Sequence, residues 1–462
     1  MNLDAFLAEI VPIACSIDHE VVRAKSRDWH FVSPLLAETL EGLVADAVVA
    51  PTTVAEVSRV AAAAYAHDVP LTPRGAGTAN YGQSVPLDGG AMLDLSKLAG
   101  VIGVGPGWVN AFAGTRIKTI EEAARQTGQE LRFFPSTQKL ATIGGFVAGG
   151  TGGVGSINYG VLRDRGNIRA VRLLTVEETP RIIDLTGADT RLVQHGYGTL
   201  GILTEIEMAL APLRPWHECL VTLPDYMSAV RLAVAIGREC GLEKKLASAY
   251  EWPIGQWMQP LAPFVPEGRS IVMAMIAEPS LPLFGEMVRE AGGEIVVSAC
   301  EGKAPYGRPI WEFAFGHTTL QAQKTRPDIT EVEAFFNAPD LVAQIMAVHA
   351  RIGRTGPMRI EIRRWDGDLV GSGSTFVTFT DQSAVNDLVK AMRDMGLRVA
   401  NPHASNVRGV GKKEIGPREI AFKREVDPKS LLNPGRFEPE EGRDAVIDRH
   451  LETDGWLAKR AV

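Results

Sequence analysis

The sequence predicts an α+β protein with two main domains, and three observations support this. The chain has 462 residues, which is enough for two or three domains with large cores. Three glycine-rich stretches lie among strand-like and helix-like segments before Pro212. After Pro212, strand-like and helix-like segments alternate in a rhythm typical of an antiparallel sheet with helices on one face. Pro212 and Pro215 bracket the boundary.

The first part begins with a predicted helix and irregular chain over residues 1–46, followed by a short apolar strand at 47–51. Thr52 or Thr53 has the residue type of an N-cap and Glu56 stands near position N3, so a helix is expected from there to about residue 67. Further strands are expected at 69–73, 91–98, 104–114 and 201–210, a helix at 119–127, and a hairpin from 169–176 and 181–185.

The second part is predicted to contain long apolar strands and amphipathic helices. Strands are expected at the start of 221–239 and at 270–280, 294–300, 357–365 and 373–380, and helices at the end of 221–239 and at 283–293 and 384–396.

The glycine-rich stretches are the strongest functional feature. They are PRGAGTANYGQSVP at 73–86, TIGGFVAGGTGGVGSINYG at 142–160, and GYGTLGILTE at 196–205. Gly75 and Gly77 lack Cβ, so the backbone there can turn sharply and form a nest of N–H groups that suits a phosphate. One such loop is usually only a turn, but three in this order indicate close backbone approach to a large, flat ligand.

Four segments resemble a known family. They are VVAPTTVAEVSRVAAAAYAHDVPLTPRGAGT at 48–78, the second glycine-rich stretch, HGYGTLGILTEIEMALAP at 195–212, and DPKSLLNPGRF at 427–437. The chain resembles the FAD-linked oxidases of the vanillyl-alcohol oxidase and p-cresol methylhydroxylase superfamily, and within it the D-lactate dehydrogenase and glycolate oxidase branch. The resemblance implies a two-subdomain FAD-binding domain at 1–212, a cap domain with an antiparallel sheet at 213–400, and a segment at 401–462 that returns to the FAD domain, peripheral after Glu438.

FAD is the cofactor that this resemblance implies, with backbone N–H groups holding its pyrophosphate. The matching positions are Arg74, Gly75, Ala76, Gly77, Thr78, Gln83, Ser84, Pro135, Thr137, Thr142, Ile143, Gly145, Gly152, Gly155 and Ile202. Thr78 stands where covalent relatives carry a histidine, and the second glycine-rich stretch has no cysteine, so non-covalent FAD is predicted. His195, the nearby histidine, is predicted to be a hydrogen-bonded turn residue.

The catalytic candidates are His403, His317 and Arg363. His403 lies in NPHASNVRGVGKK, which resembles the family's His-Gly-Ile-Gly segment, with Lys412 in place but Ala404 and its neighbours replacing the glycines. A histidine of near-neutral pKa suits removal of a hydroxyl proton, although a surface-loop histidine fits His403 equally well. His317 follows an aromatic run that either faces a substrate or only packs in the core.

Arg359, Glu361 and Arg363 alternate along one strand and therefore share a face. We expect this face to be solvated, although an arginine on it could clamp a carboxylate if it faced the flavin. The chain has no His-x-His or Gly-Asp-Gly-Asn-Leu-His pattern, so no metal is predicted, and this absence weakens the case for lactate or glycolate.

The sequence predicts an oxidoreductase that removes hydride from a hydroxyl-bearing carbon of a small, 2-hydroxy acid-like molecule. The alternatives are an aryl or phenolic alcohol oxidase and a flavoprotein subunit of a complex; the first rests on Trp252, Trp257, Trp311 and Phe315. An alkyl-ether synthase reading needs a phosphate site that the sequence does not reveal. The sequence is compatible with oxygen, a quinone or a protein as the electron acceptor, and with a homo-oligomer.

The bulk properties exclude other classes of protein. A net charge of −7 and a pI of about 5.8 do not indicate a basic protein that binds nucleic acid. Four scattered cysteines indicate neither disulfides nor a zinc site and fit a reducing compartment. The N-terminus lacks a basic region and no apolar run reaches about 18 residues, so a cytoplasmic protein without signal peptide or membrane span is expected.

Overall fold

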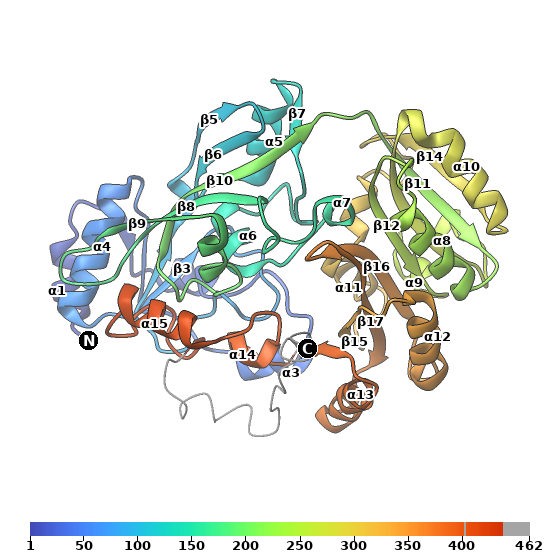
Figure 1. Cartoon of the computed structure of the whole chain (residues 1–462). Helices are drawn as coiled ribbons and strands as arrows, with labels where there is room; N and C mark the ends of the chain where they lie inside the picture. The colour runs from blue at the N-terminus through green and yellow to red at the C-terminus, as the bar shows by residue number, and fades with distance from the viewer. Residues whose placement is uncertain (402, 438–462) are drawn as a thin grey trace.

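The computed structural model describes residues 1–401 and 403–437, and its strands form three sheets (Figure 1). The predicted peripheral segment after Glu438 lies outside the described residues. Within the described part, every helix is too short or too polar to cross a lipid bilayer.

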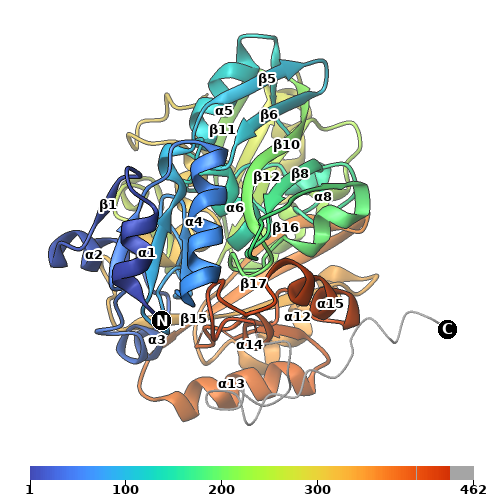
Figure 2. The same ribbon diagram turned by 90° about the vertical axis from the view of Figure 1, so that its left-hand side faces the viewer.

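The first sheet is small and mostly parallel. Its order is β1-β2-β4-β3, in which β4 runs parallel to both β2 and β3. The strands are β1 (Cys15–Ser16), β2 (Ala47–Val49), β3 (Leu71–Arg74) and β4 (Ala91–Asp94). Helices α1 (Leu3–Glu9) and α4 (Val54–His67) lie side by side against it (Figure 2), and α2 (His19–Lys25) and α3 (Pro34–Thr39) precede β2 in the chain.

Helix α4 begins where the sequence predicts, because local chemistry fixes its first turn. The Thr53 hydroxyl accepts the backbone N–H of Glu56, and the Glu56 carboxylate accepts the backbone N–H of Thr53, which is a complete capping box. The buried face of the helix, formed by Val57, Val60, Ala61, Ala63 and Ala64, packs on the first sheet.

The second sheet is antiparallel and has the order β5-β6-β10-β8-β9, with β7 paired to β10. Its strands are β5 (Val101–Gly105), β6 (Trp108–Phe112), β7 (Gln129–Leu131), β8 (Ile168–Leu174), β9 (Ile182–Thr186) and β10 (Ile202–Pro212). The predicted hairpin is present as β8 and β9, and the predicted helix is present as α5 (Ile117–Arg125). The second glycine-rich stretch contributes α6 (Ile143–Gly149) and α7 (Ser156–Tyr159).

The third sheet, which we call the cap sheet, has eight antiparallel strands in the order β14-β11-β13-β12-β16-β17-β15-β18. The strands are β11 (Trp216–Leu223), β12 (Lys244–Tyr250), β13 (Ser270–Ala277), β14 (Glu294–Cys300), β15 (Ile329–Phe336), β16 (Met358–Trp365), β17 (Asp368–Thr378) and β18 (Arg398–Ala400). Short helices α9 (Ile254–Trp257) and α11 (Gly316–Ala322) lie in its connections.

Helices cover the outer face of the cap sheet, on the right of Figure 1. They are α8 (Tyr226–Arg238), α10 (Leu281–Glu290), α12 (Leu341–Ile352) and α13 (Gln382–Asp394), and their apolar faces share one core with alternate residues of the strands. Because side chains alternate across a strand, the remaining residues of β15, β16 and β17 point away from this core, towards the N-terminal sheets.

After the cap the chain returns to the N-terminal sheets as α14 (Val407–Val410) and α15 (Pro417–Val426) (Figure 1). The closing turn is tied to two glycine-rich stretches, because the Asn433 side-chain amide donates to the carbonyl oxygens of Gln83 at 2.9 Å and Tyr197 at 2.7 Å. The segment after the cap therefore helps to hold these two loops in place.

Candidate cofactor and substrate site

One central cavity lies between the N-terminal sheets and the cap sheet. Its N-terminal side is formed by parts of the three glycine-rich stretches, and its cap side by residues of β15, β16, α11 and by Lys412. Segments that are far apart in sequence therefore meet at one site.

The first glycine-rich loop follows β3 directly and presents bare backbone to this cavity. Residues 73–81 line the cavity without interruption. A Cβ on Gly75 would overlap the Thr142 side chain, and a Cβ on Gly77 would overlap the Arg74 guanidinium. Gly77 also has a φ of +67°, in the left-handed region where other residues are strained. This glycine cradle fits a phosphate-bearing group held by backbone N–H groups.

Arg74 braces the loop from inside. Its guanidinium donates to the carbonyl oxygen of Arg27 at 2.7 Å and to the Ser84 hydroxyl at 3.1 Å. Ser84 in turn is held by the buried carboxylate of Asp28, which also accepts the backbone N–H of Gln83 at 2.9 Å. Burial lowers the pKa of Arg74 and raises that of Asp28.

The second stretch adds further backbone to the cavity wall. Thr142 is the N-cap of α6, and its hydroxyl accepts the backbone N–H of Gly145 at 3.3 Å. Gly144 packs against Ala113 so closely that a Cβ would overlap it. The Gln83 side chain donates to the carbonyl oxygen of Gly149 at 2.9 Å and so joins the first and second stretches.

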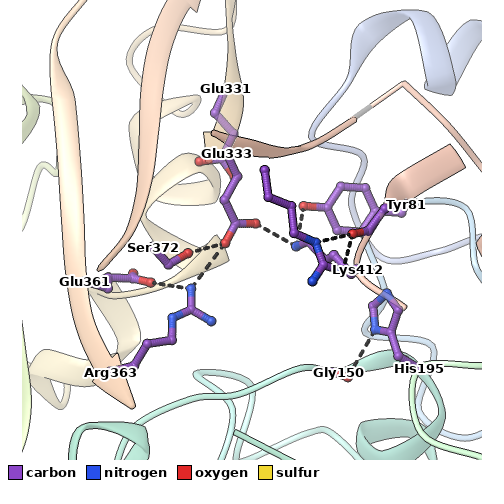
Figure 3. Close-up of polar contacts among 12 residues, drawn as sticks. Tyr81, Gly150, His195, Glu331, Glu333, Glu361, Arg363, Ser372 and Lys412 are labelled. Carbon is purple, nitrogen blue, oxygen red and sulfur yellow. Dashed lines mark hydrogen bonds and ion pairs between the residues drawn. The ribbon is translucent and has the colours of Figure 1, made fainter. Parts of the chain in front are cut away.

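Two strained residues lie at and just before the start of the third stretch. His195 and Tyr197 have φ values of +51° and +56°, which non-glycine residues seldom adopt. His195 Nδ1 lies 3.1 Å from the carbonyl oxygen of Gly150, which fixes the proton on Nδ1 (Figure 3). Its Nε2 lies 3.4 Å from the Tyr197 hydroxyl. Burial lowers the pKa of His195 to about 3, so its imidazole is neutral. His195 is thus a hydrogen-bonded turn residue, as predicted, but it also lines the cavity.

Most of the predicted cofactor positions line the cavity. They are Arg74, Gly75, Ala76, Gly77, Thr78, Gln83, Ser84, Pro135, Thr137, Thr142, Gly145 and Gly152. Three others do not. Ile143 and Ile202 are fully buried in apolar cores, and Gly155 packs against the carbonyl oxygen of Arg132.

The expectation that Arg359, Glu361 and Arg363 form a solvated face is wrong. Their exposed fractions are 3%, 2% and 4%, and all three line the cavity. They are buried because β15, two strands away in the sheet, carries Glu331 and Glu333 on the same face, which pair with the arginines (Figure 3).

These five residues form a network of alternating charge. Arg359 donates to Glu331 at 3.0 Å and to Glu361, whose carboxylate also accepts the backbone N–H of Phe315. Arg363 donates to Glu333 at 3.2 Å and lies 3.8 Å from Glu361. Two arginines therefore share one central carboxylate.

Lys412 joins this network from the returning segment. Its ammonium lies 2.7 Å from Glu333 Oε2 and 3.1 Å from the Tyr81 hydroxyl, above the Tyr81 ring (Figure 3). The Ser372 hydroxyl also donates to Glu333. Although burial alone would raise the pKa of Glu333, the neighbouring Lys412 and Arg363 hold it well below its usual range.

The two catalytic histidine candidates lie in different places. His317 lines the cavity, and neither of its buried ring nitrogens has a hydrogen-bond partner in the described structure. His403 is outside the cavity lining, and its Nδ1 contacts the Ser33 hydroxyl, so the structure does not bring it to the site. Burial lowers the pKa of each to about 4.

The sequence reasoning missed several cavity residues. They include Trp29, His30, Asn80, Tyr81, Tyr197, Glu331, Glu333 and Phe335. A signal for two of them was present in ITEVEAFF, where Glu331 and Glu333 alternate with apolar residues just as the charges of β16 do. Opposite charges at alternate positions of two apolar strands predict that the strands bury their charges against each other.

Comparison with known proteins finds relatives of part of the chain. The FAD binding domain family matches residues 45–182. The chain is 31% identical over 201 residues to the glycolate oxidase subunit GlcD of Bacillus subtilis (strain 168), covering 41% of this chain and 42% of that protein. It is 30% identical over 206 residues to the D-lactate dehydrogenase of Anaerostipes hadrus, covering 39% of this chain and 42% of that protein. The match thus spans less than half the length of these relatives.

The fold of the whole chain also has a solved counterpart. An alkyldihydroxyacetonephosphate synthase structure superposes with a TM-score of 0.68 over 94% of this chain and 85% of that chain, at 14% sequence identity. At this identity the likeness concerns the fold alone. The predicted fold class and FAD as the cofactor are confirmed, and the glycine cradle around Gly77 fits that cofactor.

Proposed function

The chain carries the FAD-binding domain of the FAD-linked oxidases of the vanillyl-alcohol oxidase and p-cresol methylhydroxylase superfamily, and from this premise we propose that it is an FAD-dependent oxidoreductase acting on a hydroxyl-bearing carbon. The observation that carries the proposal is the central cavity, in which the glycine cradle and the buried charged face of the cap sheet line one space. A cofactor in the cradle and a small polar substrate against the cap would share that space.

The proposed reaction is a two-electron oxidation. The C–H bond of the carbinol carbon breaks and its hydrogen leaves with both electrons, the hydroxyl loses its proton to the protein, and a C=O bond forms. FAD, when bound, supplies the two-electron oxidant that accepts the hydride. The backbone of the loop around Gly75 and Gly77, with Thr142 and Gly145, would hold it.

Among the histidines, we favour His317 as the proton acceptor. It is neutral because burial lowers its pKa to about 4, although the backbone of Glu312 counteracts this, and neither ring nitrogen makes a hydrogen bond of regular geometry to the described residues. His30 is bound to Gln323 at 2.7 Å, and His195 is bound to Gly150 and Tyr197. His403 does not line the cavity and therefore would not contact the substrate in this reaction.

The first compounds to test are 2-hydroxy acids, because the named relatives act on glycolate and D-lactate. An aryl alcohol is less well supported. Of the four aromatic residues that suggested it, only Phe315 lines the cavity, whereas Trp311 packs on Phe134 and Trp257 on Phe376. A role as one subunit of a complex is a second candidate, supported by the name of the GlcD relative, and co-purification of partner proteins would test it.

The test is anaerobic reduction of the bound flavin. The purified protein is loaded with FAD and mixed without oxygen with 2-hydroxy acids, aliphatic diols and polyols, and aryl alcohols. Bleaching of the oxidised flavin by one of these classes supports the proposal. If the bound FAD stays oxidised with every alcohol but is reduced by dithionite, the proposal is contradicted.

A further inference from the structure

We propose that the substrate is an uncharged molecule with at least two hydroxyl groups, not a carboxylate or a phosphate, because the cap side of the cavity neutralises its own charges. The inference rests on the proposed function and names the substrate class of the same site. It follows from the charge network of Glu331, Glu333, Arg359, Glu361, Arg363 and Lys412, of which Figure 3 labels all but Arg359.

The described charged groups that line the cap side of the cavity balance. Three are carboxylates and three are cations, and each cation is within 3.2 Å of a carboxylate. Arg359 is held between Glu331 and Glu361, and Arg363 between Glu333 and Glu361. The charge of each arginine is thus shared between two carboxylates, and the Nε of each, which has no hydrogen-bond partner among the described residues, can donate to a neutral acceptor.

Lys412 has one carboxylate partner where each arginine has two, and its ammonium is occupied as well. Glu333 Oε2 lies 2.7 Å from its ammonium, and the Tyr81 hydroxyl occupies a second direction at 3.1 Å. A substrate carboxylate that approached Lys412 would face Glu333 at the same time. Two carboxylates around one ammonium repel each other in a buried site, where charges are weakly screened.

The remaining cation of the cavity belongs to the opposite side. Arg74 lies within the glycine cradle and is bound to Arg27 and Ser84. The three histidines of the lining, His30, His195 and His317, have pKa values lowered by burial and add no charge at neutral pH. Neither Arg74 nor the histidines therefore change the charge balance of the cap side.

A hydroxyl group matches such a surface better than an anion does. Each hydroxyl donates one hydrogen bond and accepts others, so it can donate to a glutamate and accept from an arginine or lysine. A carboxylate or phosphate only accepts, so it donates no hydrogen bond to Glu331 or Glu333 and brings a like charge close to them. Alternating donors and acceptors along one face suit adjacent hydroxyls, as in a 1,2-diol or a longer polyol.

Matched substrate pairs test the inference on the unaltered protein. Ethylene glycol and glycolate, propane-1,2-diol and lactate, and glycerol and glycerate differ only in CH₂OH against carboxylate. In anaerobic flavin reduction, the second-order rate constant should be on the order of tenfold to a hundredfold higher for the uncharged member of at least one pair. Faster reduction by the acid in every pair overturns the inference but leaves the proposed function intact.

Glu333→Gln provides a second test, because it removes one carboxylate and leaves Lys412 and Arg363 with a net positive charge. Oxalate is a dianion without a hydroxyl-bearing carbon, so it binds without being oxidised. In calorimetric titration of the FAD-loaded protein, the variant should bind oxalate about tenfold to a hundredfold more tightly than the parent does. Ser372→Ala is the matched control, since it removes a hydrogen bond to Glu333 without changing charge. Asp184→Asn makes the same charge change in an exposed pair with Arg172.

The possible results distinguish failure of the inference alone from failure of the proposed function. If oxalate binds the parent as tightly as it binds Glu333→Gln, the parent already offers a cation and the inference is wrong. If Ser372→Ala or Asp184→Asn gains equal affinity, the effect is not the charge of Glu333 and the inference is also wrong. If no alcohol of any class reduces bound FAD, the proposed function fails and the inference fails with it.

Discussion

Gly77 is a position where one added methyl group should damage the cofactor site. Its φ of +67° lies in the left-handed region, and a Cβ there would overlap the Arg74 guanidinium. In Gly77→Ala, Arg74 must therefore move and give up its hydrogen bonds to the Arg27 carbonyl and the Ser84 hydroxyl. The loop that lines the cavity then loses its internal brace.

The magnitude follows from two contributions. The left-handed backbone costs alanine about 1–2 kcal/mol. Two hydrogen bonds from a charged donor contribute about 1.5–3 kcal/mol each, so their loss adds about 3–6 kcal/mol. If the sum of about 4–8 kcal/mol falls on the ligand-binding conformation of the loop, FAD affinity decreases by about 10³- to 10⁶-fold.

Gly268→Ala is the matched control for this change. Gly268 has a φ of +75° in a turn of the cap, and nothing lies within 4 Å of its added Cβ, so it carries the same backbone strain without the overlap. Flavin content after purification and the dissociation constant of FAD, measured by fluorescence titration, are compared with circular dichroism of both variants. Equal FAD affinity in Gly77→Ala and Gly268→Ala would refute the reasoning.

Three further predictions concern the cofactor link, the proton acceptor and the cap. Acid precipitation should release all FAD into the supernatant, because Thr78 offers no attachment atom; flavin retained by the polypeptide contradicts this. His317→Ala should slow flavin reduction by about 10²- to 10⁴-fold with unchanged FAD content, whereas His403→Ala stays near the parental rate; the reverse result would return the proton acceptor to His403. Burial raises the pKa of Glu218 to about 7 from 4.5, so the folded state binds more protons than the unfolded state between these values and the free energy of unfolding falls as pH rises from about 4.5 to 7. Glu218→Gln should remove about 1–3 kcal/mol of this decrease in denaturant titrations across that window, and an unchanged pH slope would contradict the assignment.

The N-terminal elements were predictable because their causes are local. The capping box of Thr53 and Glu56 starts α4 within four residues of sequence, and the glycines of the cradle mark their loop without reference to the rest of the chain. His195 was correctly predicted to be a hydrogen-bonded turn residue. Its place in the cavity was not predictable, because it depends on packing against Gly150.

The cap side of the site was not predictable from single strands. Arg359, Glu361 and Arg363 look solvated in isolation, since three charges on one strand face are costly to bury. They are buried because Glu331 and Glu333 reach the same face from a strand about thirty residues earlier, and Lys412 from about fifty residues later. Non-local charge pairing of this kind needs the sheet order, which the sequence pattern did not supply.

Anaerobic mixing of the FAD-loaded protein with the paired alcohols and acids gives the decisive comparison. Oxidised flavin is followed by its absorbance, and the carbonyl product is quantified after the reaction. We predict that an uncharged diol or polyol bleaches the flavin with one carbonyl formed per flavin, and does so faster than the matched 2-hydroxy acid. Flavin that remains oxidised with every hydroxyl compound, yet is reduced by dithionite, would contradict the assignment of this cavity as a site of alcohol oxidation.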